Sequence, residues 1–342
     1  MHTRHSFQRL NRWILVSAVL LRLITEPGIF TPGLRALHKL RENATFARAM
    51  LYLEFGCSSD YPTAAPEPGQ LTVKHPAEPQ PEAVAVLAPV KPAQPLVFTA
   101  RDAESLHIAG SCSYTVDKSE LLNRPLAGDF SGQGPKILIV HTHASESYAD
   151  SGTEDFHTED INYNVVRVGT EMAQVFEENG IAVLHDTSIN DAAGYNDAYS
   201  RMADTIAGYL EQYPSIQMVL DVHRDAYEAP DGSAGGNVVT VDGEESAQVM
   251  LVMGTDEGGQ YHPNWQDNLS CALKTQAVLQ RDYPDLCRDL ILRRSRYNQN
   301  QTPCSMLVEV GASGNTLPQA LTAARYFAAA VCKVVQNESS AQ

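Results

Sequence analysis

The chain has 342 residues, of which 43% are hydrophobic, so it is long enough for about two domains with a sizeable core. Its 41 acidic residues outnumber its 25 basic residues and give a formal net charge of −16, which excludes a protein that binds nucleic-acid backbones through clustered Lys and Arg. The composition also excludes a fibrous protein, and the apolar fraction excludes global disorder.

The first 24 residues differ from the rest in charge, since they hold four arginines and no acidic residue. A basic tip at 1–12 followed by an apolar segment at 13–24 is typical of an export signal or signal-anchor, and the segment is too short for an ordinary spanning helix. No small-x-small cleavage site follows. We therefore expect an uncleaved membrane anchor with a cytoplasmic amino terminus and an extracytoplasmic remainder.

Residues 25–96 are predicted to be a linker region, which is Pro-rich from residue 62 onward. Nine of the 19 prolines lie between Pro62 and Pro95, and proline at this density favours extended, semi-rigid chain. A lead-in segment at 97–135 follows. The six cysteines are widely spaced without a C-x-x-C pair, which favours buried free thiols over a disulfide scaffold.

From residue 136 onward, short apolar runs alternate with amphipathic segments. The pattern predicts strands at 136–140, 181–185, 217–221, 238–241, 248–254, 291–296 and 305–310, and helices at 161–179, 196–212, 264–281 and 317–335. This alternation predicts an α/β domain over 136–336, with a mainly parallel sheet flanked by helices on both sides. Ligands of such sheets bind at the carboxyl ends of the strands.

The strand at 136–140 runs directly into His141, His143 and Glu146. His143 and Glu146 form an H-x-x-E pair, whose side chains can turn toward one ion. The strand at 217–221 continues into His223, a third donor from a second strand. One Glu and two His leave the fourth coordination position of zinc open, as in a catalytic zinc site. Which of His141 and His143 binds the metal stays open.

Two carboxylates are expected to support this site. Asp221 can orient the imidazole of His223 from behind. Glu309 lies inside an otherwise apolar strand, and burial raises the pKa of a carboxyl group toward the range that a general acid or base needs near neutral pH. We therefore assign Glu309 the catalytic proton transfer.

Three polar residues are candidates for contact with substrate: Arg224, Asn298 and Gln299. Glu159 is a reserve metal ligand that can take the place of Glu146. Nucleophile chemistry lacks support, because the sequence holds no G-x-S-x-G elbow, Walker-type loop or G-x-G-x-x-G motif.

Five segments together resemble the stage II sporulation protein P family of endospore-forming bacteria, across roughly residues 112–335. They are HTHASESY (141–148), DVHRDA (221–226), YPDLCRDLILRR (283–294), RYNQN (296–300) and EVGASGNT (309–316). The resemblance implies the fold of zinc-dependent N-acetylmuramoyl-L-alanine amidases, with Zn²⁺ as cofactor. It also implies cleavage of peptidoglycan during engulfment of the forespore, at the amide that joins glycan to stem peptide and in the peptide cross-links.

The resemblance further implies two protein partners, the lytic transglycosylase stage II sporulation protein D and the membrane protein stage II sporulation protein M. In the amidases themselves the glutamate ligand lies further along the chain than in H-x-x-E, which keeps Glu159 as the alternative to Glu146. Two other functions stay open. One is a zinc carboxypeptidase of peptides, suggested by H-x-x-E with nearby arginines, and the other is a non-catalytic, membrane-anchored wall-binding module.

Overall fold

The structure is a computed structural model that describes residues 96–341. These residues belong to the second of two compact units of the chain, Ala83–Gln342. The predicted basic tip, anchor and Pro-rich linker, and Cys57 with them, lie outside the described residues. Over the described part of the chain, no helix is both long enough and apolar enough to cross a membrane.

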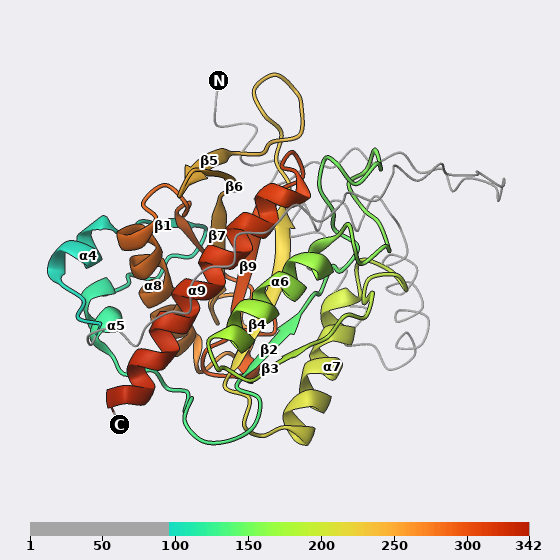
Figure 1. Ribbon diagram of the computed structural model, residues 1–342. Coiled ribbons are helices and arrows are strands. Elements are labelled where there is room, and N and C mark those ends of the chain that lie inside the picture. Colours follow the sequence, from blue (N-terminus) through green and yellow to red (C-terminus); the bar gives the residue numbers. More distant parts are fainter. Residues whose placement is uncertain (1–95, 342) are drawn as a thin grey trace, which may run out of the picture. The chain divides into compact units, whose positions relative to one another are not determined.

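A seven-stranded sheet forms the centre of the fold (Figure 1), with the strand order β1-β8-β7-β9-β4-β2-β3. Every neighbouring pair is parallel except β7 and β9, which run antiparallel. The prediction of a mainly parallel sheet is confirmed. The strands are β1 (Ile108–Gly110), β2 (Ile137–Val140), β3 (Val183–His185), β4 (Met218–Asp225), β7 (Val249–Gly254), β8 (Leu290–Arg293) and β9 (Met306–Ala312).

The segment predicted as a strand at 238–241 lies outside this sheet. It forms β5 (Val238–Val241), which pairs antiparallel with β6 (Glu244–Ala247) in a separate two-stranded sheet. Asp242 and Gly243 join the two strands with positive φ angles of 50° and 87°. This is the backbone of a tight hairpin turn, and an Asp-Gly pair is the usual sequence for it.

The helices form two unequal layers on the sheet, which confirms helices on both faces. α6 (Val165–Glu178), α8 (Trp265–Asp282) and α9 (Leu317–Ala341) share the large hydrophobic core on one face, and Figure 1 shows α6 and α9 crossing the front of the sheet. α7 (Ala198–Gln212) packs on the other face through Met202 and Ile206, against Leu138, Val140 and Val219. The short helices α4 (Ala100–Ser105) and α5 (Lys118–Asn123) precede β2.

The predicted helix at 161–179 begins four residues later than expected. The side chain of Asn164 accepts a hydrogen bond from the Val166 amide at 2.9 Å and so caps α6. Asp160, which precedes the range predicted as a helix, instead accepts a hydrogen bond from the Asn162 amide in the preceding turn. Gly180 follows the end of the helix in a left-handed conformation, with a φ of 74°.

The lead-in segment contributes to the same sheet. β1 is an edge strand that pairs with β8, although its residues are mostly exposed and show no hydrophobic pattern. Among the described cysteines, Cys271, Cys304 and Cys332 are buried, Cys112 and Cys287 are partly buried, and none of the five forms a disulfide, as expected.

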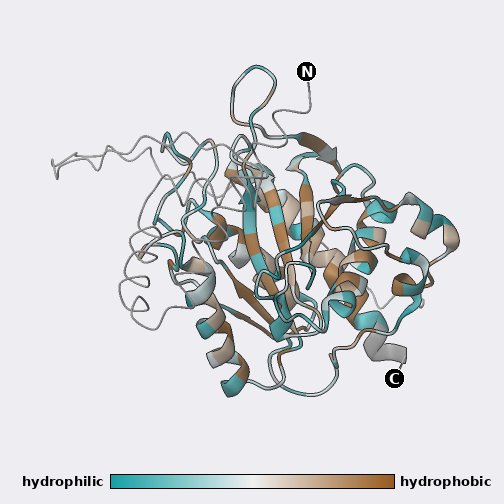
Figure 2. Ribbon diagram, turned by 180° about the vertical axis from the view of Figure 1, so that it is seen from behind, coloured by the Kyte–Doolittle hydropathy of each residue, from teal (hydrophilic) through white to brown (hydrophobic). Residues whose placement is uncertain are grey.

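The polar residues at the carboxyl ends of β2, β4 and β9 lie at the same end of the sheet. β9, β4 and β2 are neighbours and parallel, so their carboxyl ends lie side by side. Successive residues of a strand point to opposite faces, and Asp221, His223 and Glu309 share a face with Val219 and Leu307, which is the face that α7 covers in part. Figure 2 shows this side, where the largely brown strands carry teal hydrophilic bands.

Candidate active site

His223 and Glu309 lie next to each other across the β4–β9 pair, as register partners. Both are inside their strands, because β4 extends to Asp225 and β9 to Ala312. The sequence placed His223 just beyond the end of a shorter strand, and this prediction of the strand end is wrong by four residues. The longer strand fixes the backbone at His223 by the sheet hydrogen bonds of a central strand.

Two carboxylates hold the imidazole of His223. Its Nδ1 lies 3.2 Å from Oε2 of Glu146, and its Nε2 lies 2.9 Å from Oδ1 of Asp221. Burial lowers the pKa of His223, but the two adjacent carboxylates outweigh that effect and raise it well above its usual value. The pocket around His223 is therefore built to stabilise positive charge.

Asp221 also fixes the loop that follows β2. It accepts hydrogen bonds from the amide of Thr142 at 2.8 Å and from its hydroxyl at 2.6 Å. Burial raises the pKa of this carboxyl, but the contacts with His223 and Thr142 lower it by more, so that it lies below its usual value. One buried carboxylate thus links β4 to the start of the loop that carries His143.

His143 lies close to His223 on the α7 side of the sheet. The centroids of the two rings are 5.5 Å apart with an interplanar angle of 73°. The side chain is buried, and its Nδ1 has no hydrogen-bond partner among the described residues. Burial lowers the pKa of His143 to about 4, so its ring is neutral and a lone pair is free at neutral pH.

Glu146 is the second donor of the loop. Its Oε2 accepts a hydrogen bond from the Arg224 amide at 3.1 Å and contacts His223. Burial raises the pKa of Glu146, whereas Arg224 and His223 together lower it well below its usual range. Glu146 is therefore a carboxylate at neutral pH.

Glu309 is a carboxyl group with an unmet hydrogen bond. Its Oε2 is buried and lacks a partner among the described residues. Burial raises its pKa to about 8, despite the opposing effect of His223. At neutral pH this carboxyl holds a proton, which it can deliver to a group bound beside it.

The two reserve ligands lie elsewhere. His141 continues the alternation of Ile137 and Ile139 and faces α6, where its Nδ1 donates to the carbonyl of Val222 at 3.0 Å and its Nε2 lies 2.8 Å from Nε2 of His185. Burial lowers the pKa of His141 to about 3. Glu159 is exposed on the loop before α6. The structure therefore brings His143 and Glu146, rather than His141 and Glu159, to His223.

The three predicted substrate contacts are engaged with the main chain. Arg224 is buried and donates through Nε to the carbonyl of Ser147 and through Nη2 to that of Phe156, each at 2.9 Å. Asn298 donates to the carbonyl of Tyr199 at 2.8 Å. Both ends of the Gln299 amide bind β7, at Gly254 and Val252. In this structure the three residues join segments of the fold, and their contact with substrate stays a prediction.

Zinc fits the chemistry of this donor set. His143 offers an unpartnered buried nitrogen and Glu146 is an ionised carboxylate, whereas both ring nitrogens of His223 face carboxylates, so His223 has to lose a proton and exchange one of these contacts to bind the ion. The side chains are not drawn together around one point: over residues 96–341, no group of three or more His, Cys, Asp or Glu has an arrangement that could hold a metal ion. His223 and Glu146 contact each other instead.

Aromatic residues that sequence reasoning missed surround His143. Tyr195 stacks on its ring, and Tyr199 meets it edge-on with centroids 5.5 Å apart. They come from the loop after β3 and the start of α7. Nothing in the spacing of these tyrosines along the chain points to the site.

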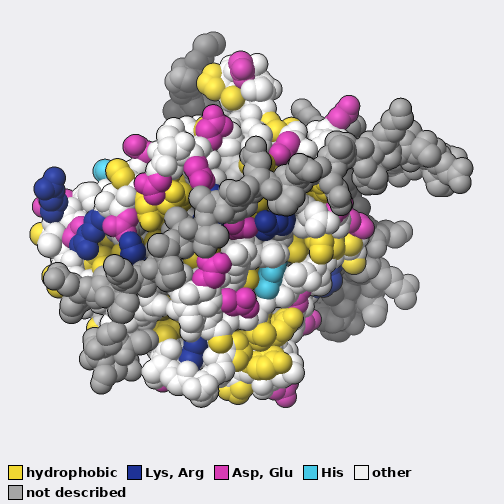
Figure 3. Space-filling model, in the orientation of Figure 1, with side chains coloured by type: hydrophobic (Ala, Val, Ile, Leu, Met, Phe, Trp, Pro, Cys, Tyr) yellow, Lys and Arg dark blue, Asp and Glu magenta, His cyan; other side chains and the backbone are white. Residues whose placement is uncertain are grey.

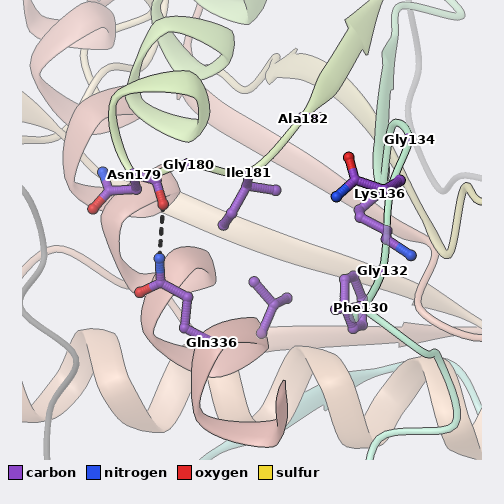
Figure 4. Close-up of a pocket in the computed structure, with 11 residues that line it drawn as sticks. Phe130, Gly132, Gly134, Lys136, Asn179, Gly180, Ile181, Ala182 and Gln336 are labelled. Atoms are coloured by element: carbon purple, nitrogen blue, oxygen red, sulfur yellow. Dashed lines mark hydrogen bonds between the residues drawn. The ribbon is translucent and has the colours of Figure 1, made fainter. Parts of the chain in front are cut away.

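A cavity of about 340 Å³ lies at the amino ends of β2 and β3, at the opposite end of these strands from the candidate site (Figure 4). Its lining includes Lys136 and Ala182, which precede β2 and β3, and Gln336 of α9, which donates to the carbonyl of Asn179. Lys136 is the one charged side chain among the described lining residues. The cavity thus offers no carboxylate or imidazole and is separate from the candidate site.

Comparisons with solved structures and with a family model give the following similarities. Among solved structures, this chain is similar to the CwlD amidase of Clostridioides difficile in complex with the GerS lipoprotein, with 17% identity, a TM-score of 0.41, and coverage of 60% of this chain and 100% of that one. It is also similar to the N-acetylmuramoyl-L-alanine amidase AmiC2 of Nostoc punctiforme, at 14% identity and a TM-score of 0.35, with 60% and 97% covered.

A third similar structure is the N-acetylmuramyl-L-alanine amidase Ami1 of Mycobacterium smegmatis, at 13% identity and a TM-score of 0.38, with 61% of this chain and 98% of that one covered. No curated protein matches the sequence. The family model of Stage II sporulation protein P (SpoIIP) matches residues 87–332, well over half of the chain and all of the strands described above. The chain therefore belongs to the stage II sporulation protein P family.

Proposed function

We propose that this protein is a zinc-dependent peptidoglycan hydrolase of sporulation, which cleaves the amide between N-acetylmuramic acid and L-alanine during engulfment. One observation carries the proposal. Glu309, whose Oε2 is buried and unpartnered among the described residues, lies in register beside His223, and Glu146 and His143 contact His223 from the loop after β2. Family membership supports the link to sporulation.

His143, Glu146 and His223 are the residues that would hold the zinc ion. When bound, zinc supplies Lewis-acid polarisation of the amide carbonyl and lowers the pKa of water. Asp221, whose Oδ1 lies 2.9 Å from Nε2 of His223, would orient this ring. Glu309 would relay a proton from the attacking water to the leaving amine of L-alanine, and burial raises its pKa toward the range that such a transfer needs.

The same proposal includes cleavage of peptide cross-links at the same site and assembly with the stage II sporulation proteins D and M. It also includes retention in the membrane by residues 13–24, which would place the described domain outside the cytoplasm, next to its substrate. The carboxypeptidase alternative loses part of its basis, because Arg224 binds main-chain carbonyls.

The test is hydrolysis of purified sacculi by the full chain with added zinc, followed by mass spectrometry of the soluble products. We expect free stem peptides from the wild type and a loss of about 10²–10⁴-fold in rate for Glu309→Gln, the usual contribution of a general acid or base. Glu154→Gln changes an exposed carboxylate of the same chain and should keep the wild-type rate. Release of neither stem peptides nor cleaved cross-links by the wild type would refute the proposal.

A further inference from the structure

Tyr195 is the exposed aromatic residue next to the candidate active site. It lies in the loop between β3 and α7, and its ring stacks on that of His143 with centroids 3.8 Å apart and planes 10° apart. His143 is 6% exposed, whereas Tyr195 is 50% exposed. Tyr195 therefore covers the imidazole with one face of its ring while half of the residue stays exposed to solvent.

The loop of Tyr195 is fastened to the segment that carries His143. Oδ2 of Asp191 accepts a hydrogen bond from the hydroxyl of Ser145 at 2.6 Å, and Nδ2 of Asn190 donates to the carbonyl of Thr142 at 2.8 Å. Arg201 of α7 holds the same loop by donating to the carbonyl of Asn190 at 2.9 Å. The ring thus has a fixed place over the site.

The neighbouring tyrosines differ from Tyr195 in exposure. Tyr199 and Tyr297 are partly buried and contact each other, with ring centroids 5.8 Å apart. Tyr195 therefore leaves apolar ring surface in water that Tyr199 and Tyr297 partly bury, at a cost in hydrophobic stabilisation. A flat ring with a polar edge, half in water, is suited to pack against a ligand that has both an apolar face and hydroxyl groups.

We propose that Tyr195 forms a saccharide-binding subsite, against which the ring of the muramoyl sugar packs while its amide reaches His143 and Glu309. The proposal rests on the proposed function, since it identifies the sugar as the part of the substrate that this residue contacts. A pyranose ring presents axial C–H groups on one face and hydroxyl groups around its rim, which matches an aromatic surface that remains hydrated at its edge.

Binding of peptide-free glycan chains of alternating N-acetylglucosamine and N-acetylmuramic acid, measured by calorimetry with the full chain, tests the subsite without turnover. We expect Tyr195→Ala to weaken binding about tenfold, whereas Tyr195→Phe, which retains the ring, stays within about twofold of the wild type. Tyr195→Leu keeps apolar bulk without a flat ring and should resemble Tyr195→Ala, which covers the case of an unstable alanine variant.

Tyr114→Ala is the matched control. Tyr114 is 40% exposed and stacks on Trp265 with centroids 5.2 Å apart, so the change removes a similar half-exposed, stacked ring. It lies near the first residue of α8, away from His143, and its loss should leave glycan binding unchanged. Equal binding by the wild type and Tyr195→Ala would overturn the proposal.

A kinetic comparison separates sugar contact from support of His143. The substrates are a muramoyl peptide and the corresponding lactoyl peptide, which retains the scissile amide without the sugar ring. We expect Tyr195→Ala to lower kcat/KM several-fold more on the muramoyl peptide, mainly through KM. Equal losses on both substrates would assign Tyr195 to the support of His143 and overturn the subsite. If the wild type cleaves neither peptide, the proposed function fails, and the glycan-binding measurement still decides the role of Tyr195.

Discussion

At the scale of single residues, a glycine of α6 gives the two buried histidines their space. A Cβ at Gly169 would lie 2.6 Å from Nε2 of His141 and 2.7 Å from Nε2 of His185, closer than packed atoms allow. We expect Gly169→Ala to lower the free energy of unfolding by about 1–3 kcal/mol, as overpacked cores do. Urea unfolding of the full chain followed by circular dichroism measures it.

Gly208 provides the opposite case in the other helix layer. It lies inside α7 with open space around its position, so Gly208→Ala gains helix propensity and should raise the free energy of unfolding by about 0.5–1 kcal/mol. Destabilisation of similar size by both substitutions would contradict the steric account of Gly169.

The sequence predicted that His143, Glu146 and His223 lie close together. Strand periodicity would also have decided between His141 and His143, a choice that the sequence analysis left open. Alternation along β2 carries over to His141, which therefore lies on the face of Ile137 and Ile139. The engagement of Arg224 with the carbonyls of Ser147 and Phe156, and the stacking of Tyr195 on His143, depend on loops that meet only in the folded chain. No local pattern encodes such contacts.

At the scale of elements, α4 is held by a capping box and one ion pair. Thr99 and Asp102 cap each other's backbone, and the Asp102 carboxylate binds Arg281 of α8 at 2.6 Å. The hydrogen bond from Arg281 contributes most to a pKa of Asp102 well below its usual value, against the effect of burial. A carboxyl with a lowered folded-state pKa stabilises the fold above its unfolded pKa of about 4, and this contribution is lost as the pH falls through the folded pKa.

We therefore expect Asp102→Asn to reduce the free energy of unfolding by about 1 kcal/mol at pH 7, a modest value because the pair is partly solvated. The difference from the wild type should shrink as the pH falls from about 4 toward 2. Urea unfolding across this pH range measures it, with Glu104→Gln, an exposed carboxylate of the same helix, as the control. A difference that stays constant with pH would contradict the ion-pair account.

Strand positions followed from the apolar runs, whereas pairing did not. The runs at 136–140 and 305–310 form β2 and β9. A single sequence carries no signal for the antiparallel pairing of β7 with β9, because both are buried on two faces and read as continuous apolar runs. β1 is too short and too exposed to show a period of two.

At the scale of the whole molecule, charge should oppose binding to the cell wall. The chain carries a formal net charge of −16, and Figure 3 shows acidic side chains scattered over one face, with basic side chains in small separate groups. Wall polymers are also largely anionic. Salt screens such repulsion, since the Debye length falls from about 30 Å at 0.01 M to about 8 Å at 0.15 M.

Binding of the full chain to purified sacculi should therefore increase when salt is raised from about 0.01 M to about 0.15 M. Co-sedimentation at constant protein concentration measures the bound fraction. A bound fraction that falls with salt would show that local basic groups, rather than the overall charge, govern the encounter.

Because β7 and β9 run antiparallel, the loops that follow β7 and β8 lie at the opposite end of the sheet from the loops that follow β2, β4 and β9. β4 and β2 end beside the candidate active site, whereas β7 and β8 end at the opposite end of the sheet, where Gly258 and Gly259 form an exposed turn. A fluorophore or affinity tag inserted at that turn would sit at the far end of the strands from His223. The fold thus offers an attachment point for watching the enzyme on a sacculus while its working edge stays free.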